Sequence, residues 1–160
     1  MAIYMKFQGI DGTVTAQGYE KQIELTSMQF GVGRHVSMDT GNASNRLHGR
    51  PSISEITVSK SLDDASSGLM KEALSGDKGK DVEIHVVETS SKQLTEYVTY
   101  TLKDVLVSAY SVSTGGGVPS ESISLSFAEI EVAVKPKDSK NASKGGAQRV
   151  GYNLRTGVPK

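Results

Sequence analysis

The stretch ISLSFAEIEVAV, residues 123–134, decides the fold. Ile123, Leu125 and Phe127 occupy alternate positions, and after Ala128 the apolar residues continue at the opposite parity. Alternation predicts a half-buried strand, because successive side chains of a strand point to opposite faces. The change of parity would turn the buried face over, so we expect a β-bulge at this point.

The same alternation recurs earlier in the chain. Residues 97–113 are rich in β-branched and aromatic side chains and change parity at Lys103 and Asp104, so one long strand or two are expected there. Shorter strands are expected within residues 3–7, 19–32, 53–60 and 82–86. Two long strands that each change their buried face are typical of a closed sheet. The sequence therefore predicts a mainly β protein, a small closed β-barrel of antiparallel strands.

One α-helix is expected at the side of the barrel, at about residues 62–75. Gly76 supplies its end, and Ser61, Asp63 and Asp64 supply polar caps and negative charge at its beginning. The apolar residues of this segment recur at helical spacing and predict one stripe, formed by Leu62, Ala65, Leu69, Met70, Ala73 and Leu74. A lone helix among strands should pack this stripe on the barrel.

Two stretches carry little hydrophobicity. Residues 36–52 are rich in Ser, Asn and Gly, which predicts a long extended loop, and a loop of this length in a compact domain usually has a function. Residues 135–160 form a basic C-terminal tail, with seven Lys or Arg and one acidic residue, so the net charge is +6 there and −6 in residues 1–134. With Tyr152 as its single aromatic residue, this tail favours an acidic neighbouring surface over nucleic acid.

Composition bounds the remaining classes. The 160 residues suffice for one domain, 1–160, with its own core. The absence of Cys excludes disulfides and thiolate metal sites, and 18 basic against 18 acidic residues give no global field that recruits nucleic acid. No apolar run approaches the roughly 18 residues of a membrane helix, and the N-terminus has no signal-peptide pattern. We expect no membrane insertion, and export, if any, by another machine.

No catalytic motif is found. His35 and His48 share the long loop with Asp39, but their spacing fits no compact zinc motif and favours a solvated loop. His85 lies on the polar face of a strand and is expected at the surface. The glycines at 115–117 precede a strand, which indicates a hairpin loop and argues against a phosphate cradle at a helix start. We expect no enzyme activity, no cofactor and no metal site.

Several segments together resemble a known family. The most specific are VLVSAYSVS at 105–113, the glycine loop, and PSESISLSF at 119–127. Others occur in the family's order: IYMKF (3–7), GIDG (9–12), SMQFGVGR (27–34), PSISEI (51–56), VSKSLDDAS (58–66) and GYNL (151–154). Across essentially the whole chain they are similar to the Hcp (haemolysin-coregulated) family, the tube proteins of bacterial type VI secretion systems. The departures, at Leu47-His48 and near Gly117, fall in loops.

The resemblance implies a structural protein that contributes to virulence by delivering effectors. It implies a β-barrel with a side helix, six copies in a ring, and rings stacked into a hollow tube. A contractile sheath would expel this tube, tipped by a spike, so the protein would be cytoplasmic before firing and secreted afterwards without a signal peptide. The expected partners are further copies of the chain, the sheath, spike and baseplate proteins, and effector proteins in the lumen.

Two sets of residues are assigned from the resemblance. Gln29 lies in a segment that matches a channel-lining strand, and it is expected to face the lumen. The loop 36–52 is expected to contact the next ring, with the candidates Arg34, Asp39, Asn42, Asn45, Arg46 and Arg50. Two alternatives stay open, namely a monomeric ligand-binding β-barrel and a secreted effector whose site is assembled from scattered carboxylates.

Overall fold

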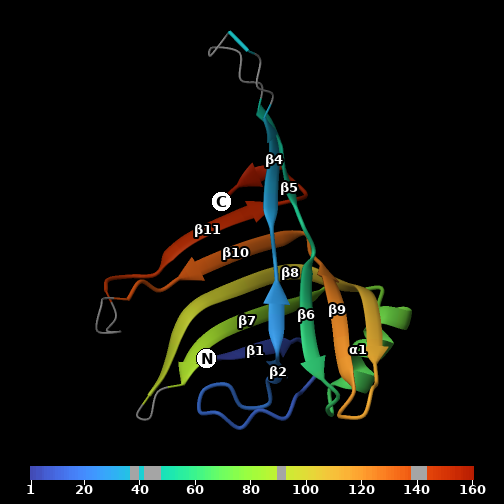
Figure 1. Cartoon of the computed structure of the whole chain (residues 1–160). Helices are drawn as coiled ribbons and strands as arrows, with labels where there is room; N and C mark the ends of the chain where they lie inside the picture. Colours follow the sequence, from blue (N-terminus) through green and yellow to red (C-terminus); the bar gives the residue numbers. More distant parts are fainter. Residues whose placement is uncertain (37–39, 42–47, 90–92, 138–143) are drawn as a thin grey trace.

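The computed structural model describes residues 1–36, 40–41, 48–89, 93–137 and 144–160 (Figure 1). The prediction of a mainly β protein is confirmed, because the described residues form twelve strands and one helix, α1 (Ser66–Ser75). The strands are β1 (Ala2–Phe7), β2 (Ile23–Leu25), β3 (Ser27–Gln29), β4 (Val32–Val36), β5 (His48–Ile53), β6 (Ile56–Ser61), β7 (Lys80–Thr89), β8 (Leu94–Ser113), β9 (Ser120–Ser126), β10 (Glu129–Val134), β11 (Gln148–Asn153) and β12 (Val158–Pro159).

Strand β8 belongs to two sheets. Its first half lies antiparallel between β7 and β10, and from Leu106 onward it pairs with β9. The change follows Asp104, whose φ of 57° lies in the left-handed region, and the register with β7 shifts beside it. Such a residue turns the strand over, so that Leu102 before it and Val105 after it both face the core. The predicted change of parity is confirmed here, within one continuous strand.

The second change of parity, in residues 123–134, separates two strands. β9 ends at Ser126, and β10 begins at Glu129 after a bend at Ala128, whose N–H donates to the carbonyl of Lys103 at 3.1 Å. β9 pairs with β6 and β8, whereas β10 pairs with β8 and β11. The expected β-bulge is therefore wrong, because the chain leaves one sheet at this bend and enters the other.

The predicted closed barrel is corrected to two sheets joined through β8. One runs β12-β11-β10-β8-β7-β1-β2, and the other continues from β8 through β9 and β6 to β3. Thr26 lies between β2 and β3, and its N–H donates to the carbonyl of Ser59 at 2.7 Å. The β1–β2 and β3–β6 ladders both stop beside this residue, so the sheets approach each other there without a continuous ladder.

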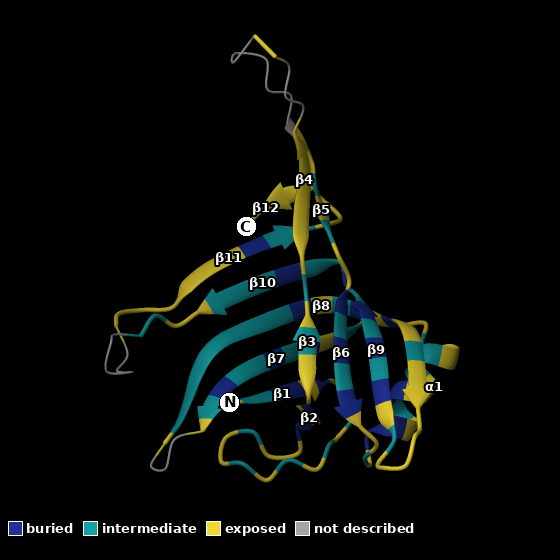
Figure 2. Ribbon diagram, viewed as in Figure 1, coloured by how far each residue is buried: buried dark blue, intermediate teal, exposed yellow. Residues whose placement is uncertain are grey.

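Alternate side chains of both sheets meet in one core. The buried residues of this core lie along the strands of both sheets, as the colours of Figure 2 show. The parity predicts that Leu125, Phe127, Ile130 and Val132 are buried. This is found for Leu125, Phe127 and Ile130, at 0%, 8% and 3% exposure, whereas Val132 is only partly buried. Full burial of such a side chain stabilises the fold by roughly 1.5–3 kcal/mol. The fully buried apolar residues come from strands of both sheets and from α1: Met5, Ile23, Ile56, Val58, Leu69, Val82, Ile84, Val87, Leu102, Val105, Ile123 and Leu125.

Helix α1 begins later than its apolar spacing predicts. The carboxylate of Asp63 accepts a hydrogen bond from the N–H of Ala65 at 2.9 Å, and this turn precedes the first helical residue, Ser66. The expected end at Gly76 is found, where the Gly76 N–H donates to the carbonyl of Glu72. Leu69 is buried, but three members of the predicted stripe are exposed on the outside, namely Leu62, Met70 and Leu74. The helix therefore carries apolar surface that its own sheet does not cover.

The segment predicted as a long loop is partly a hairpin. β4 and β5 pair antiparallel from Val32 opposite Ile53 to Val36 opposite His48, and this pair projects away from the two sheets (Figure 1). Every residue of β4 is exposed. The expected loop is corrected in this part, because its flanks are strands that hydrogen-bond to each other.

The C-terminal tail contributes to the sheet. β11 pairs with β10 along its whole length, and β12 pairs with β11 through Tyr152 and Asn153. Exposed ion pairs fix this tail to the preceding strands, from Arg149 to Glu131, Arg155 to Asp104 and Lys160 to Glu129. The basic charge of residues 148–160 is therefore largely held by the chain's own carboxylates.

Candidate functional site

The outward face of the sheet β3-β6-β9-β8 carries two neighbouring rows of mostly small polar side chains. Gln29 lies opposite Thr57, which lies opposite Ser124, and the Thr57 and Ser124 hydroxyls are 3.4 Å apart. The neighbouring row runs through Ser27, Ser59, Ser122 and Ser111. Because inward positions such as Val58 are buried, alternation places these rows on the opposite, accessible face. We call these two rows the hydroxyl face.

Gln29 lies at the end of this face and is exposed, whereas its neighbours Met28 and Phe30 pack against the core. The structure therefore agrees with the expected alternation at this strand. That Gln29 faces a lumen concerns an assembly and stays a prediction.

Both ends of this sheet have an open edge among the described strands. β3 pairs with β6 on one side, and residues 106–113 of β8 pair with β9 on one side. Leu106 and Val112 on the β8 edge are 41% and 49% exposed. Unpaired N–H and C=O groups at such an edge can template pairing with another chain.

An apolar groove opens at the base of the β4–β5 hairpin. It has a volume of about 260 Å³ and lies between the hairpin and strands β10 to β12. Phe30, Val32, Pro51 and Ile53 form one wall, and the other is formed by Ile130, Val132, Val150, Gly151, Tyr152 and Pro159. We call this set the apolar groove. At its floor the Phe30 ring meets Tyr100 edge-on at 6.2 Å and Phe127 at 6.5 Å between ring centroids.

The candidate stacking residues are only partly described. Arg34 lies on β4 opposite Pro51 of β5, and both Arg34 and Arg50 are exposed on the hairpin. The candidates Asp39, Asn42, Asn45 and Arg46 lie outside the described residues. The hairpin thus presents two arginines on the projecting part of the molecule.

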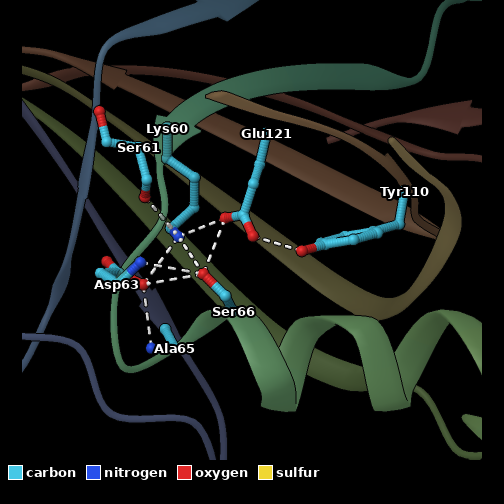
Figure 3. A network of polar contacts seen from close by, with 7 residues as sticks. All are labelled: Lys60, Ser61, Asp63, Ala65, Ser66, Tyr110 and Glu121. Atoms are coloured by element: carbon cyan, nitrogen blue, oxygen red, sulfur yellow. Dashed lines mark hydrogen bonds and ion pairs between the residues drawn. The ribbon is translucent and has the colours of Figure 1, made fainter. Parts of the chain in front are cut away.

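A buried polar network joins β6, β9 and the beginning of α1 (Figure 3). The Nζ of Lys60 lies 2.6 Å from Oε2 of Glu121 and 2.7 Å from Oδ1 of Asp63, and the side chains of Lys60 and Glu121 are both 0% exposed. The hydroxyl of Ser66 accepts from Lys60 at 3.1 Å and donates to Glu121 at 2.9 Å, and the Tyr110 hydroxyl donates to the other oxygen of Glu121. Each charge is therefore paired and hydrogen-bonded, as burial requires.

The network shifts the pKa values of Glu121 and Tyr110. Burial raises the pKa of the Glu121 carboxyl, but hydrogen bonds from Lys60, Tyr110 and Ser66 outweigh it, so the pKa is lowered. Burial and the Glu121 carboxylate raise the pKa of Tyr110 to about 12. Lys60 donates a hydrogen bond to Ser66, whereas a nucleophilic serine needs a base that accepts its proton, so the arrangement of this pair is a structural one.

Lys60 and Glu121 are not among the residues predicted from the sequence, although a signal for them exists. Lys60 shares its parity with Ile56 and Val58 on β6, and Glu121 shares the parity of the buried Ile123 on β9. A charged residue at a core-facing position is costly to bury without a partner. Opposite charges at such positions of two strands therefore predict a pair, and the register confirms that they are direct neighbours.

A second polar cluster lies on the outer face of β7 and β8. His85 Nδ1 is 2.7 Å from Glu96 Oε1, Lys135 Nζ is 2.6 Å from Glu96 Oε2, and the Thr99 hydroxyl donates to Glu96. The Tyr19 ring packs edge-on against His85 with centroids 5.4 Å apart. His85 lies on the outer face of the strand, as expected, but Tyr19 packs against its ring and the side chain is only 13% exposed.

Glu96 is expected to make stability depend on pH in the acid range. Burial raises the pKa of the Glu96 carboxyl, but hydrogen bonds from Lys135, Thr99 and His85 outweigh burial and lower the pKa to about 2. The carboxylate therefore contributes stability that is present above pH 4.5 and is lost as the pH falls through about 2. We expect Glu96→Gln to lower the free energy of unfolding at neutral pH by about 1–2 kcal/mol. The loss is limited to about this size because solvent partly screens the Lys135 charge.

The measurement is urea unfolding of both proteins from neutral pH to about pH 2. The stability difference between wild type and Glu96→Gln should shrink at the acid end, while exposed Glu24→Gln should follow the wild type. A difference that stays constant with pH would contradict the role assigned to the Glu96 carboxylate.

Neither a metal site nor a membrane-spanning helix is present in residues 1–36, 40–41, 48–89, 93–137 and 144–160. No group of three His, Asp or Glu side chains in these ranges is arranged to hold a metal ion. No helix in the same ranges is long and apolar enough to span a bilayer. Of the residues considered for a zinc site, His35 lies on β4 and His48 on β5, and Asp39 lies outside the described residues.

A β-rich subunit with open sheet edges, an apolar groove and a projecting hairpin has the features of an assembling structural protein. The family model described as "Type VI secretion system effector, Hcp" matches residues 4–134. The chain therefore belongs to the Hcp family, the tube proteins of type VI secretion systems, and the resemblance found in the sequence is confirmed.

Individual relatives agree with this assignment. Protein hcp1 of Pseudomonas aeruginosa is 29% identical over 108 residues, which are 66% of this chain and 67% of the relative. A solved structure described as a type six secretion system protein matches with a TM-score of 0.91 and 26% identity, covering 99% of both chains. Hcp1 from Salmonella typhimurium shares the fold, with a TM-score of 0.78 and 22% identity over 99% of this chain and 98% of that one.

Proposed function

We propose that this protein is the subunit of a hexameric ring, and that such rings stack into the hollow tube of a type VI secretion system. The observation that carries the proposal is the sheet β3-β6-β9-β8, which has an open edge at each end. The two edges differ in length and side chains, so a contact between them joins unlike surfaces. Such head-to-tail contacts form a ring when the rotation between copies closes. The resemblance to the Hcp family supports six as the number of copies in this ring.

In this ring the hydroxyl face lines the lumen and Gln29 projects into it. Its Ser, Thr and Gln side chains offer hydrogen bonds without a fixed charge. Effector proteins of either net charge can therefore lie against it without Coulombic repulsion. This chemistry suits a protein that carries effectors to the outside, and no catalytic role is assigned to the ring itself.

The hairpin β4–β5 makes the contact to the next ring. Arg34 and Arg50 supply exposed charge on its described part, and Asp39, Asn42, Asn45 and Arg46 are the further candidates. The tube is assembled in the cytoplasm against the baseplate and spike proteins and inside the sheath, whose contraction secretes it. The tail 135–160 is a less suitable surface for acidic partners than its composition predicts, because Arg149, Arg155 and Lys160 pair with carboxylates of the same chain.

Sedimentation velocity at micromolar concentration tests the ring. We expect a species of six protomers, about 102 kDa from six times 17.0 kDa, because every copy offers both edges. Negative-stain microscopy of the same sample should show rings with an open centre. A 17.0 kDa monomer at every concentration would refute the proposal and favour a monomeric ligand-binding domain.

A further inference from the structure

We infer that, within the ring, the apolar groove of one copy receives the exposed face of α1 from the neighbouring copy. This inference rests on the proposed function, because it names the two surfaces that meet when the ring closes. The face is defined by Met70 and Leu74 of α1 together with Leu62, which precedes the helix and borders the same depression as Met70; all three apolar side chains are exposed. We call these three the α1 face.

In a single copy, the groove exposes apolar side chains to water. Val32 and Val150 on its two walls are 61% and 63% exposed, and Val158 beside it is 55% exposed. Scattered apolar residues are ordinary on a protein surface, but these line one continuous hollow between the hairpin and β10 to β12. A contiguous apolar hollow of this kind gains free energy when apolar side chains of a partner fill it.

The α1 face supplies side chains of the matching kind. Leu62, Met70 and Leu74 are 49%, 48% and 77% exposed. Met70 and Leu62 border a depression that also includes Tyr110 of β8, so this face continues into the open β8 edge. An unbranched Met adapts to an irregular hollow more readily than a branched side chain does.

The two surfaces lie on opposite sides of the subunit, as a head-to-tail ring requires. The groove is beside β3 and β4, at one end of the sheet β3-β6-β9-β8. Helix α1 lies behind the other end, next to β8 and β9, on the side away from β10 and β11 (Figures 1 and 2). Placing a second copy side by side in the same orientation brings the α1 side of one to the groove side of the other.

Charge at the two rims is complementary. The hairpin beside the groove carries the exposed Arg50, and the beginning of α1 carries the exposed Asp64 next to Asp63. This agrees with a contact between unlike faces, whereas two grooves facing each other would bring like charges together. Complementary rims fix the orientation and the register of a contact more than its affinity.

The buried network of Lys60 and Glu121 also favours this contact, because it holds the beginning of α1 in place. Ser66, the first residue of α1, is hydrogen-bonded to both charges, so the beginning of the helix is held in a fixed position on β6 and β9. The α1 face therefore does not need to be ordered when the copies meet, which lowers the entropy cost of assembly.

Three single substitutions at exposed positions test the inference by sedimentation velocity. Val150→Glu in the groove and Met70→Glu on the α1 face should each raise the concentration for half-assembly at least about a hundredfold, because they place a carboxylate in an apolar contact. Val118→Glu, at a residue 72% exposed in the β8–β9 loop, is the control and should leave rings intact. Thermal unfolding of each variant checks that the subunit remains folded.

A cysteine pair supplies an independent readout. The chain contains no Cys, so Val150→Cys with Met70→Cys introduces the only two thiols. Oxidation of rings formed by this double variant should give a ladder of covalently linked species of up to six subunits. The control variant, Glu24→Cys with Met70→Cys, should give no such ladder. Rings that survive Met70→Glu, or a Val150–Met70 pair that forms no ladder in intact rings, would overturn the inference. A wild type without rings would instead refute the proposed function.

Discussion

Lys60→Met is expected to destabilise the subunit by about 3–5 kcal/mol, because it leaves the Glu121 carboxylate buried without its counter-charge. Both side chains are 0% exposed, and the Ser66 and Tyr110 hydroxyls that remain cannot neutralise the charge. The loss should appear as a lower urea midpoint with an unchanged slope. All variants are compared at one protein concentration, because assembly adds to apparent stability.

Two controls make the Lys60 experiment specific. Lys103→Met removes an ion pair with Asp81 in which both side chains are more than half exposed, so it should cost less than about 1 kcal/mol. The double variant Lys60→Met with Glu121→Gln removes both charges and should recover much of the lost stability. A Lys60→Met loss as small as that of Lys103→Met would mean that the pair is solvated.

Replacing residues 39–49 with a short Gly-Ser bridge is expected to abolish tubes and secretion while leaving the ring assembled. The core lies in the two sheets and α1, and the hairpin projects beyond them, so shortening it removes no core residue (Figure 1). An exposed charge pair between two rings contributes at most about 1 kcal/mol. In the proposed ring six hairpins make this contact together, so shortening all six hairpins should prevent stacking.

Microscopy and sedimentation of the same preparation separate the two levels of assembly. Rings without tubes is the expected result, and an equal-length Gly-Ser replacement tests whether the side chains or the reach of the hairpin matter. Long tubes formed by the shortened protein would show that another surface makes the stacking contact.

The strands and the two changes of parity could be predicted because alternation is a local property. Ile123 and Leu125 reveal their burial by their own neighbours in sequence. The bend at Ala128 was mistaken for a bulge, since both produce the same change of parity. Which sheet a strand joins depends on partners that are distant in the chain. Alternation therefore could not show whether the strands close into a barrel or form two joined sheets.

The candidate site was less accessible to prediction. A pattern of apolar residues at helical spacing does not distinguish a stripe that packs on its own sheet from one that stays exposed, so Met70 and Leu74 were assigned to the wrong environment. The apolar groove is formed by Phe30, Pro51 and Val150, which are too far apart in sequence for any periodicity to connect them. The polar composition of residues 36–52 indicated a distinct segment, but it could not show that the flanks of this segment are paired strands.

The unbroken course of β8 through both sheets has a mechanical consequence. Its 20 residues have a contour length of roughly 66 Å, and its covalent backbone links the β7–β10 side of the subunit to β9. A thrust applied to one sheet is therefore transmitted to the other through covalent bonds, and neighbouring ladders are loaded in shear, so that several hydrogen bonds resist at once. A subunit pushed from behind as part of a rigid rod would thus deform as one body.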